Sequence, residues 1–89
     1  RVPEVLVRVT RAGRAVPGAL VFAEAEERQG MRPWGVRADG AGTSWFVLPE
    51  PGRYRFTCDG AAAQVEAREH PVGAPPGYGH VQRVKLELG

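Results

Sequence analysis

Apolar residues recur mainly at every second position along this chain, and the breaks between the alternating runs contain Gly and Pro. A period of two places successive side chains on opposite faces of a β-strand, whereas an amphipathic helix needs a period near 3.6. The pattern predicts strands over residues 4–11, 19–27, 35–38, 43–48, 52–58, 61–68 and 81–88. These short runs, without a convincing helix, predict an all-β fold, a seven-stranded Greek-key β-sandwich that forms a single domain over residues 1–89.

Each predicted strand has an apolar face that we expect to point into the core. The expected core positions are Val5, Val7, Val9, Val21, Ala23, Ala25, Tyr54, Phe56, Cys58, Val84, Leu86 and Leu88. The segment 43–48 is apolar on both faces, because Trp45 and Val47 alternate with Phe46 and Leu48. Periodicity therefore leaves open which face of this segment is buried.

Two segments, 19–27 and 61–69, are rich in Ala and Glu and also contain good helix formers. Gly30 could end a helix in the first of them. In that segment, however, Val21 and Ala23 fall on one side and Glu24 on the other, as a strand requires. A helical arrangement would scatter the same residues, so we predict strands in both places.

Composition excludes several classes of protein. Of 89 residues, 43% are hydrophobic and 25% charged, which is typical of an ordinary globular domain. The net charge of +2 is too small to indicate a nucleic-acid partner. Apolar runs are too short to span a bilayer, so we also expect no membrane insertion.

The inventory of chemically reactive side chains is small. The chain has a single serine, Ser44, a single cysteine, Cys58, two histidines and two aspartates. It lacks the G-x-S-x-G, P-loop, H-E-x-x-H and C-x-x-C motifs of common hydrolases, nucleotide-binding proteins and metal sites. We therefore predict that the protein is not an enzyme and uses no cofactor.

His70 and His80 flank a Gly- and Pro-rich segment that also contains Tyr78. A metal site needs three or four ligands, and Glu69 is the only obvious third ligand near the two imidazoles. We therefore expect no metal and interpret His70, Tyr78 and His80 as solvated candidate contacts on a loop.

Cys58 cannot form a disulfide within the chain, because it has no second cysteine to pair with. A thiol can act as a nucleophile, but Cys58 alternates with Tyr54 and Phe56 on a face that we expect to be buried. In such a position a thiol behaves as a small hydrophobic group, and we favour that role.

Several outward cations could form a basic stripe for phosphate or nucleic acid. They are Arg53, Arg55, Arg83 and Lys85. Glu66 and Glu87 alternate with them on neighbouring outward positions, so a mixed, solvated face is the favoured interpretation.

Three turn motifs resemble those of carboxypeptidase-regulatory-like domains, which belong to the transthyretin (prealbumin)-like β-sandwiches. Residues 13–21 (GRAVPGALV) resemble the family's opening "G-x-P-V-x-G-A-x-V", with Ala15 where proline is usual. Residues 39–42 (DGAG) are similar to its "T-D-x-x-G" turn, and residues 48–54 (LPEPGRY) to its "L-P-P-G-x-Y" corner. The resemblance implies a transthyretin- or immunoglobulin-like sandwich. It also implies a non-catalytic spacer or binding unit within a larger secreted, cell-envelope or assembly protein.

The predicted faces leave more large apolar side chains outside than a small monomer needs to expose. They are Leu6, Leu20, Phe22, Trp34 and one of Trp45 and Phe46. We take Leu6, Leu20, Phe22, Trp34 and Trp45 as a candidate partner surface. The other interpretation is that loops cover them, or that a shift of register has exchanged the two faces.

These observations favour a structural or protein-interaction module that binds a protein partner or associates with itself, through outward aromatics and strand edges. The alternative is a carbohydrate- or small-ligand-binding module in which Trp34, Trp45 and Tyr78 stack on sugar rings. Aromatics aligned on one exposed face would favour this alternative, and aromatics packed inside would exclude it.

Overall fold

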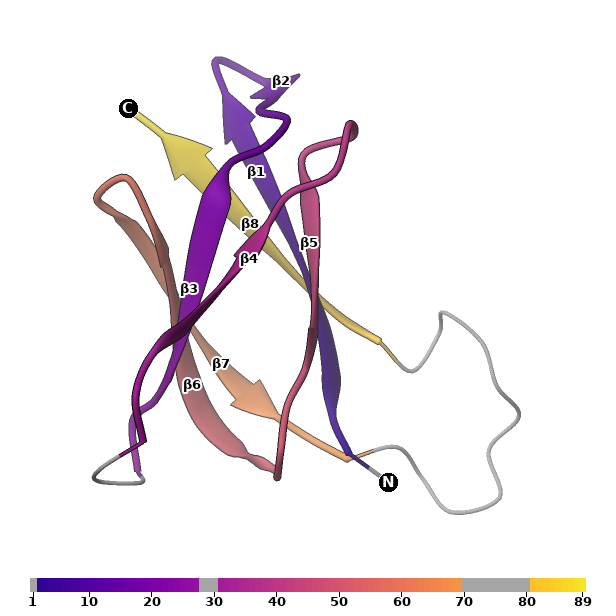
Figure 1. The fold of residues 1–89 in the computed structure, drawn as a ribbon, viewed down its shortest axis with the longest axis vertical. Coiled ribbons are helices and arrows are strands. Elements are labelled where there is room, and N and C mark those ends of the chain that lie inside the picture. Colours follow the sequence, from indigo (N-terminus) through magenta and orange to yellow (C-terminus); the bar gives the residue numbers. More distant parts are fainter. Residues whose placement is uncertain (1, 28–30, 70–80) are drawn as a thin grey trace.

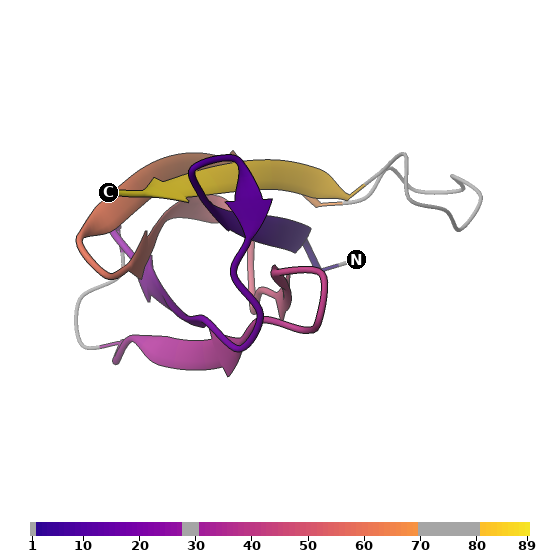
Figure 2. The same cartoon turned by 90° about the horizontal axis from the view of Figure 1, so that it is seen from above.

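The computed structural model describes residues 2–27, 31–69 and 81–89 and shows two sheets packed face to face (Figures 1 and 2). The strands are β1 (Glu4–Arg11), β2 (Arg14–Ala15), β3 (Leu20–Ala25), β4 (Trp34–Arg37), β5 (Thr43–Val47), β6 (Gly52–Cys58), β7 (Ala61–Ala67) and β8 (Gln82–Leu88). Sheet A contains β2, β1, β5 and β8, and sheet B has the order β4-β3-β6-β7. The described ranges contain no helix, and therefore no helix with the length and apolar character needed to cross a membrane. The predicted all-β sandwich is confirmed, and β2 is an addition to the seven expected strands.

Strand β1 is the centre of sheet A. It pairs antiparallel with β5 on one side and parallel with β8 on the other, and the β8 ladder runs from Val5 to Arg11. Its inward side chains, Val5, Val7 and Val9, are completely buried. Both edges and one face of β1 are therefore withdrawn from water.

The Ala- and Glu-rich segments form strands, as alternation predicts. In β3, Val21 and Ala23 are fully buried and Glu24 is exposed. Strand β7 pairs antiparallel with β6 along its whole length, from Ala61 opposite Cys58 to Ala67 opposite Gly52. Pairing with neighbouring strands and burial of one face outweigh the helix propensity of these residues.

The inner face of β5 is the one that contains Phe46. Pairing places Phe46 beside Val5, so both side chains point into the core, and Leu48 and Ser44 are buried with them. Phe46 meets Phe56 of the opposite sheet edge to face, with ring centroids 5.0 Å apart. Trp45 therefore lies on the outer face of sheet A.

The segment between β5 and β6 carries the chain from sheet A to sheet B. At this corner the hydroxyl of Tyr54 donates a hydrogen bond of 2.7 Å to the backbone carbonyl of Glu50. The ring of Tyr54 is almost completely buried, so this bond satisfies the one polar atom of a core side chain. A buried Tyr that bonds to the backbone a few residues upstream fixes similar corners in immunoglobulin-type sandwiches.

A second turn, residues 39–42, joins the two sheets at β4 and β5. Asp39 Oδ1 accepts hydrogen bonds from the backbone N–H groups of Ala41 (2.9 Å) and Thr43 (3.0 Å). Gly42 has a φ of +75°, and its carbonyl accepts a 2.7 Å bond from the N–H of Val9. A Cβ at Gly42 would lie 2.8 Å from the carbonyl oxygen of Val9, so only glycine fits beside β1.

The sandwich is also closed along the side where β7 meets β8 (Figure 2). Here the side-chain amide of Gln82 forms two hydrogen bonds with the backbone at the end of β7, as a neighbouring strand would. Its Oε1 accepts from the N–H of Arg68 (2.8 Å), and its Nε2 donates to the carbonyl of Glu66 (2.9 Å). The open edge of β7 is thereby joined to sheet A at this end.

We predict that Gly42→Ala lowers the free energy of unfolding by about 2 kcal/mol or more, since left-handed backbone alone costs an L-residue roughly 1–2 kcal/mol. The close approach to Val9 adds to this cost. Gly40→Ala is the matched control, because a Cβ there meets nothing within 4 Å. Urea denaturation of the two variants measures the difference. Equal stability of both would show that the tight contact between the turn and β1 is not a constraint.

Candidate functional site

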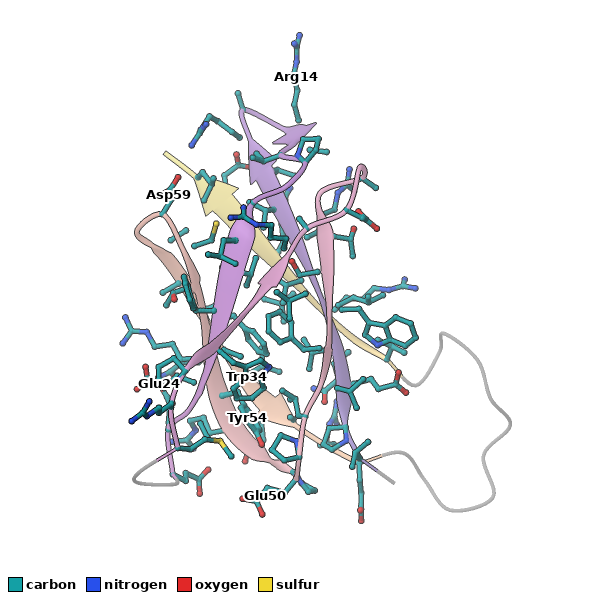
Figure 3. All side chains as sticks on the ribbon, in the orientation of Figure 1. Arg14, Glu24, Trp34, Glu50, Tyr54 and Asp59 are labelled. Carbon is teal, nitrogen blue, oxygen red and sulfur yellow. The ribbon has the colours of Figure 1, made fainter. Side chains whose placement is uncertain are left out.

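The five residues of the predicted partner surface lie in three different places. Leu6 and Trp45 share the outer face of sheet A. Leu20 and Phe22 lie on the outer face of sheet B. Trp34 points between the sheets, where Figure 3 shows it next to Tyr54. These five side chains therefore do not form one continuous surface.

Trp34 is turned inward because of its pairing. It lies opposite Ala23, whose side chain is fully buried, so both point toward the core. The indole makes edge contacts with Phe46, at 6.3 Å between centroids, and with Tyr54, at 6.5 Å. It is half-buried and belongs to the core rather than to an outer surface.

Phe22 and Leu20 face outward, but they have a partner within the sheet. A Cβ placed on Gly35 would lie 3.1 Å from Cε1 of Phe22 and 3.0 Å from Cδ1 of Leu20. The two side chains therefore lie over the bare backbone of Gly35 on the edge strand. An aromatic side chain that covers a cross-strand glycine stabilises a sheet without any external partner.

The outer face of sheet A has an apolar strip formed by Leu6, Trp45 and Val47. Trp45 is 58% exposed and Val47 57%, the largest exposures among the big apolar side chains of the described ranges. Leu6 lies beside Trp45 on the neighbouring strand. The indole Nε1 of Trp45 donates a 3.0 Å hydrogen bond to Glu4 Oε1, which anchors the ring on the face.

Next to the apolar strip lies a basic cluster, which consists of Arg8, Arg83 and Lys85. Arg83 pairs with Leu6, and Lys85 pairs with Arg8, so the three cations come from two adjacent strands. All three are exposed. They surround a shallow depression of about 380 Å³, which is lined by Leu6, Arg8, Thr43, Arg83, Val84 and Lys85.

The predicted basic stripe is divided between the two faces of the sandwich. Arg53 and Arg55 lie on the outer face of sheet B, where Arg53 is 4.0 Å from a carboxylate oxygen of Glu66. Arg83 and Lys85 lie on sheet A and are joined there by Arg8. Arg8 alternates with the buried valines of β1 and so points outward, but nothing in the sequence of that strand indicates that β8 lies beside it.

Glu87, the acid next to Lys85 along β8, is turned to a partner on β1. The hydroxyl of Thr10 donates a 2.8 Å hydrogen bond to its Oε1. This bond is the largest cause of the lowered pKa of Glu87, and burial opposes it. The backbone N–H of Gly13, the charge of Lys85 and the backbone N–H of Ala12 also lower the pKa. The carboxylate of Glu87 is therefore ionised and held at the end of the sheet.

Cys58 lies at the end of β6 with only 5% of its surface exposed. Burial raises the pKa of its thiol, and the neighbouring charge of Asp59 raises it further, while Arg11 opposes the shift. The thiol is thus protonated near neutral pH, as expected of a core residue rather than a nucleophile.

The predicted loop contacts His70, Tyr78 and His80 lie outside the described residues. Within residues 2–27, 31–69 and 81–89, no three His, Cys, Asp or Glu side chains come close enough to hold a metal ion.

No protein-family model matches the chain, and no curated protein matches it. Among solved structures it is similar to a DUF3823 family protein from Parabacteroides merdae, with a TM-score of 0.70 and 22% identity, over 99% of this chain and 47% of that one. It is also similar to the Bacillus anthracis TIE protein, with a TM-score of 0.62 and 14% identity, over 98% of this chain and 16% of that one. The chain spans less than half of either protein, and the likeness is one of fold: a β-sandwich domain.

We predict that Cys58 of the folded protein reacts slowly with a thiol reagent and quickly after denaturation. Because its pKa is raised in the folded state, the thiol ionises first in the unfolded chain as pH rises above about 8.5. Stability should therefore fall with rising pH in that range, and by less in Cys58→Ala than in the native chain. Denaturant titrations at neutral and alkaline pH measure this difference. Fast labelling of the native protein would contradict the burial.

Proposed function

We propose that this chain is a non-catalytic β-sandwich module that binds a protein partner, or a second copy of itself, through the outer face of sheet A. The observation that supports this most directly is the exposure of Trp45 and Val47, both over half accessible on β5. Phe22 faces outward too, but it covers Gly35. No residue of the described ranges covers the apolar strip in the same way, and exposed apolar patches of this kind are typical of interaction sites.

The orientation of the aromatics argues against the carbohydrate alternative. A sugar-stacking platform needs rings side by side on an accessible face, whereas Trp34 packs on Phe46 and Tyr54 inside the sandwich. Of the three aromatics invoked for stacking, Trp45 is the one that the described residues place on the outer face of sheet A. Tyr78 lies outside these residues. A protein contact is therefore the function that the geometry supports best.

We further propose that the domain belongs to the carboxypeptidase-regulatory-like group and is part of a larger protein. Two of the three motifs of that resemblance coincide with strict backbone requirements: the left-handed Gly42 of the DGAG turn, and Tyr54, whose hydroxyl bonds to Glu50 in the corner. Both structural neighbours are longer chains of which this fold is one part, which agrees with a module.

Site-specific photo-crosslinking in the native host tests the contact face. A benzophenone amino acid at position 45 should form adducts with a protein, because Trp45 lies at the centre of the proposed surface. The matched control places the same amino acid at position 22, on the opposite face of the sandwich. Mass spectrometry of the adducts identifies a partner protein or a second copy of the chain.

Adducts at position 22 and none at position 45 would place the contact on the outer face of sheet B and contradict the proposal. The absence of adducts at both positions would contradict an interaction role, and glycan adducts at position 45 would favour the carbohydrate alternative. Thermal melting of both substituted proteins checks that the fold is intact.

A further inference from the structure

We propose that the outer face of sheet A binds an acidic segment of a partner protein, whose carboxylates lie on Arg8, Arg83 and Lys85 while an apolar side chain covers Trp45 and Leu6. This inference rests on the proposed function and specifies the chemistry of the partner. It follows from the arrangement, charge and surroundings of the basic cluster.

The pairing of β1 with its two neighbours places these side chains on a regular lattice. One row across the sheet contains Trp45, Leu6 and Arg83. The next row contains Thr43, Arg8 and Lys85. Adjacent strands lie about 4.8 Å apart and alternate residues of a strand roughly 7 Å apart. The long side chains of the basic cluster therefore can reach the same carboxylate, with the apolar strip directly beside it.

Within the described residues, no carboxylate pairs with Arg8 or Arg83, whereas Lys85 lies close enough to Glu87 to lower its pKa. Arg8 and Arg83 have no ion-pair or hydrogen-bond partner within the part of the chain that the structure describes. Of the described acids on this face, Glu4 accepts a hydrogen bond from the indole N–H of Trp45, and Glu87 accepts one from the hydroxyl of Thr10. Charge complementarity thus calls for an anionic partner.

The outer face of sheet B is different, which makes it a useful reference. There Arg55 lies opposite Glu24 on the neighbouring strand, and Arg53 lies near Glu66. Cations and acids alternate on that face. On the outer face of sheet A, by contrast, Arg8 lies opposite Thr43 and Lys85, and Arg83 lies opposite Leu6, so neither cation has an acid across from it in the described ladders.

The apolar strip favours an acidic polypeptide over other anions. A bare phosphate or a nucleic-acid backbone would use the three cations but would leave Leu6 and Val47 in water. A peptide segment that carries carboxylates beside an apolar side chain can contact both parts of the face. The apolar contact then provides affinity and the charges provide orientation and rate of association.

The test uses two short synthetic peptides and NMR spectra of the isotope-labelled chain. One peptide alternates Glu with Ser and has a central Phe, and the control peptide has Gln in place of each Glu. We expect the Glu peptide to shift the backbone amides of Arg8, Arg83 and Lys85 and the indole N–H of Trp45. The Gln peptide should bind far more weakly, and added salt should weaken only the Glu peptide.

The double variant Arg8→Glu/Arg83→Glu should lose roughly tenfold in affinity for the Glu peptide, because attraction becomes repulsion at two exposed positions. Arg53→Glu/Arg55→Glu makes the same change of net charge on sheet B and should bind normally. Should the first variant misfold, Arg8→Gln/Arg83→Gln removes the same charges without adding new ones.

Three results would overturn the proposal: no binding of the Glu peptide, equal binding of the Gln peptide, or an equal loss in the sheet B variant. Tighter binding of a uronic-acid oligomer or of DNA at the same residues would assign the face to another class of macromolecule. Crosslinking at position 45 that persists unchanged in Arg8→Glu/Arg83→Glu would refute the acidic partner and leave the proposed function standing. Absence of that crosslink in the native chain would instead count against the function itself.

Discussion

Hydrogen bonding on both edges of β1 is the constraint on which the rest of this domain depends. Because β5 and β8 both pair with β1, the strand has no free edge over most of its length, and its three inward valines are completely buried. The tight contact of Gly42 with Val9 exists because the 39–42 turn must pass beside this strand. The same pairing brings Arg8 next to Lys85 and Leu6 next to Trp45. A single strand thus organises both the core and the proposed contact face.

The strands and most of the core could be predicted because alternation is a local property. The buried face of a strand can be recognised from its own sequence, without the neighbouring strands. Examples are Val5, Val7 and Val9 in β1, and Tyr54, Phe56 and Cys58 in β6. The family-like turns also follow local rules, since Gly42 and the Tyr54 corner satisfy requirements of the backbone nearby. The two-residue β2 was missed because a strand that short has no periodicity to detect.

The site could not be predicted in the same way, because it depends on register between distant segments. The sequence pattern starts a strand at Gly35 and leaves Trp34 outside it, whereas pairing with Ala23 turns the indole inward. Both Trp45 and Phe46 fit an inward position by periodicity, and the pairing of Phe46 with Val5 decides between them. Arg8 and Lys85 are far apart in sequence, and only the parallel ladder makes them neighbours.

The parallel pairing of β1 and β8 also gives the domain a mechanical property. The start of β1 and the end of β8 lie at opposite ends of the sandwich (Figure 1). Tension applied at Glu4 and Leu88 would therefore pull these two strands along their length in opposite directions. Under such shear the hydrogen bonds of the ladder share the load and must break together, whereas bonds at a peeled edge would break one after another. A pull in this direction therefore loads the whole β1–β8 ladder, from Val5 to Arg11, at the same time.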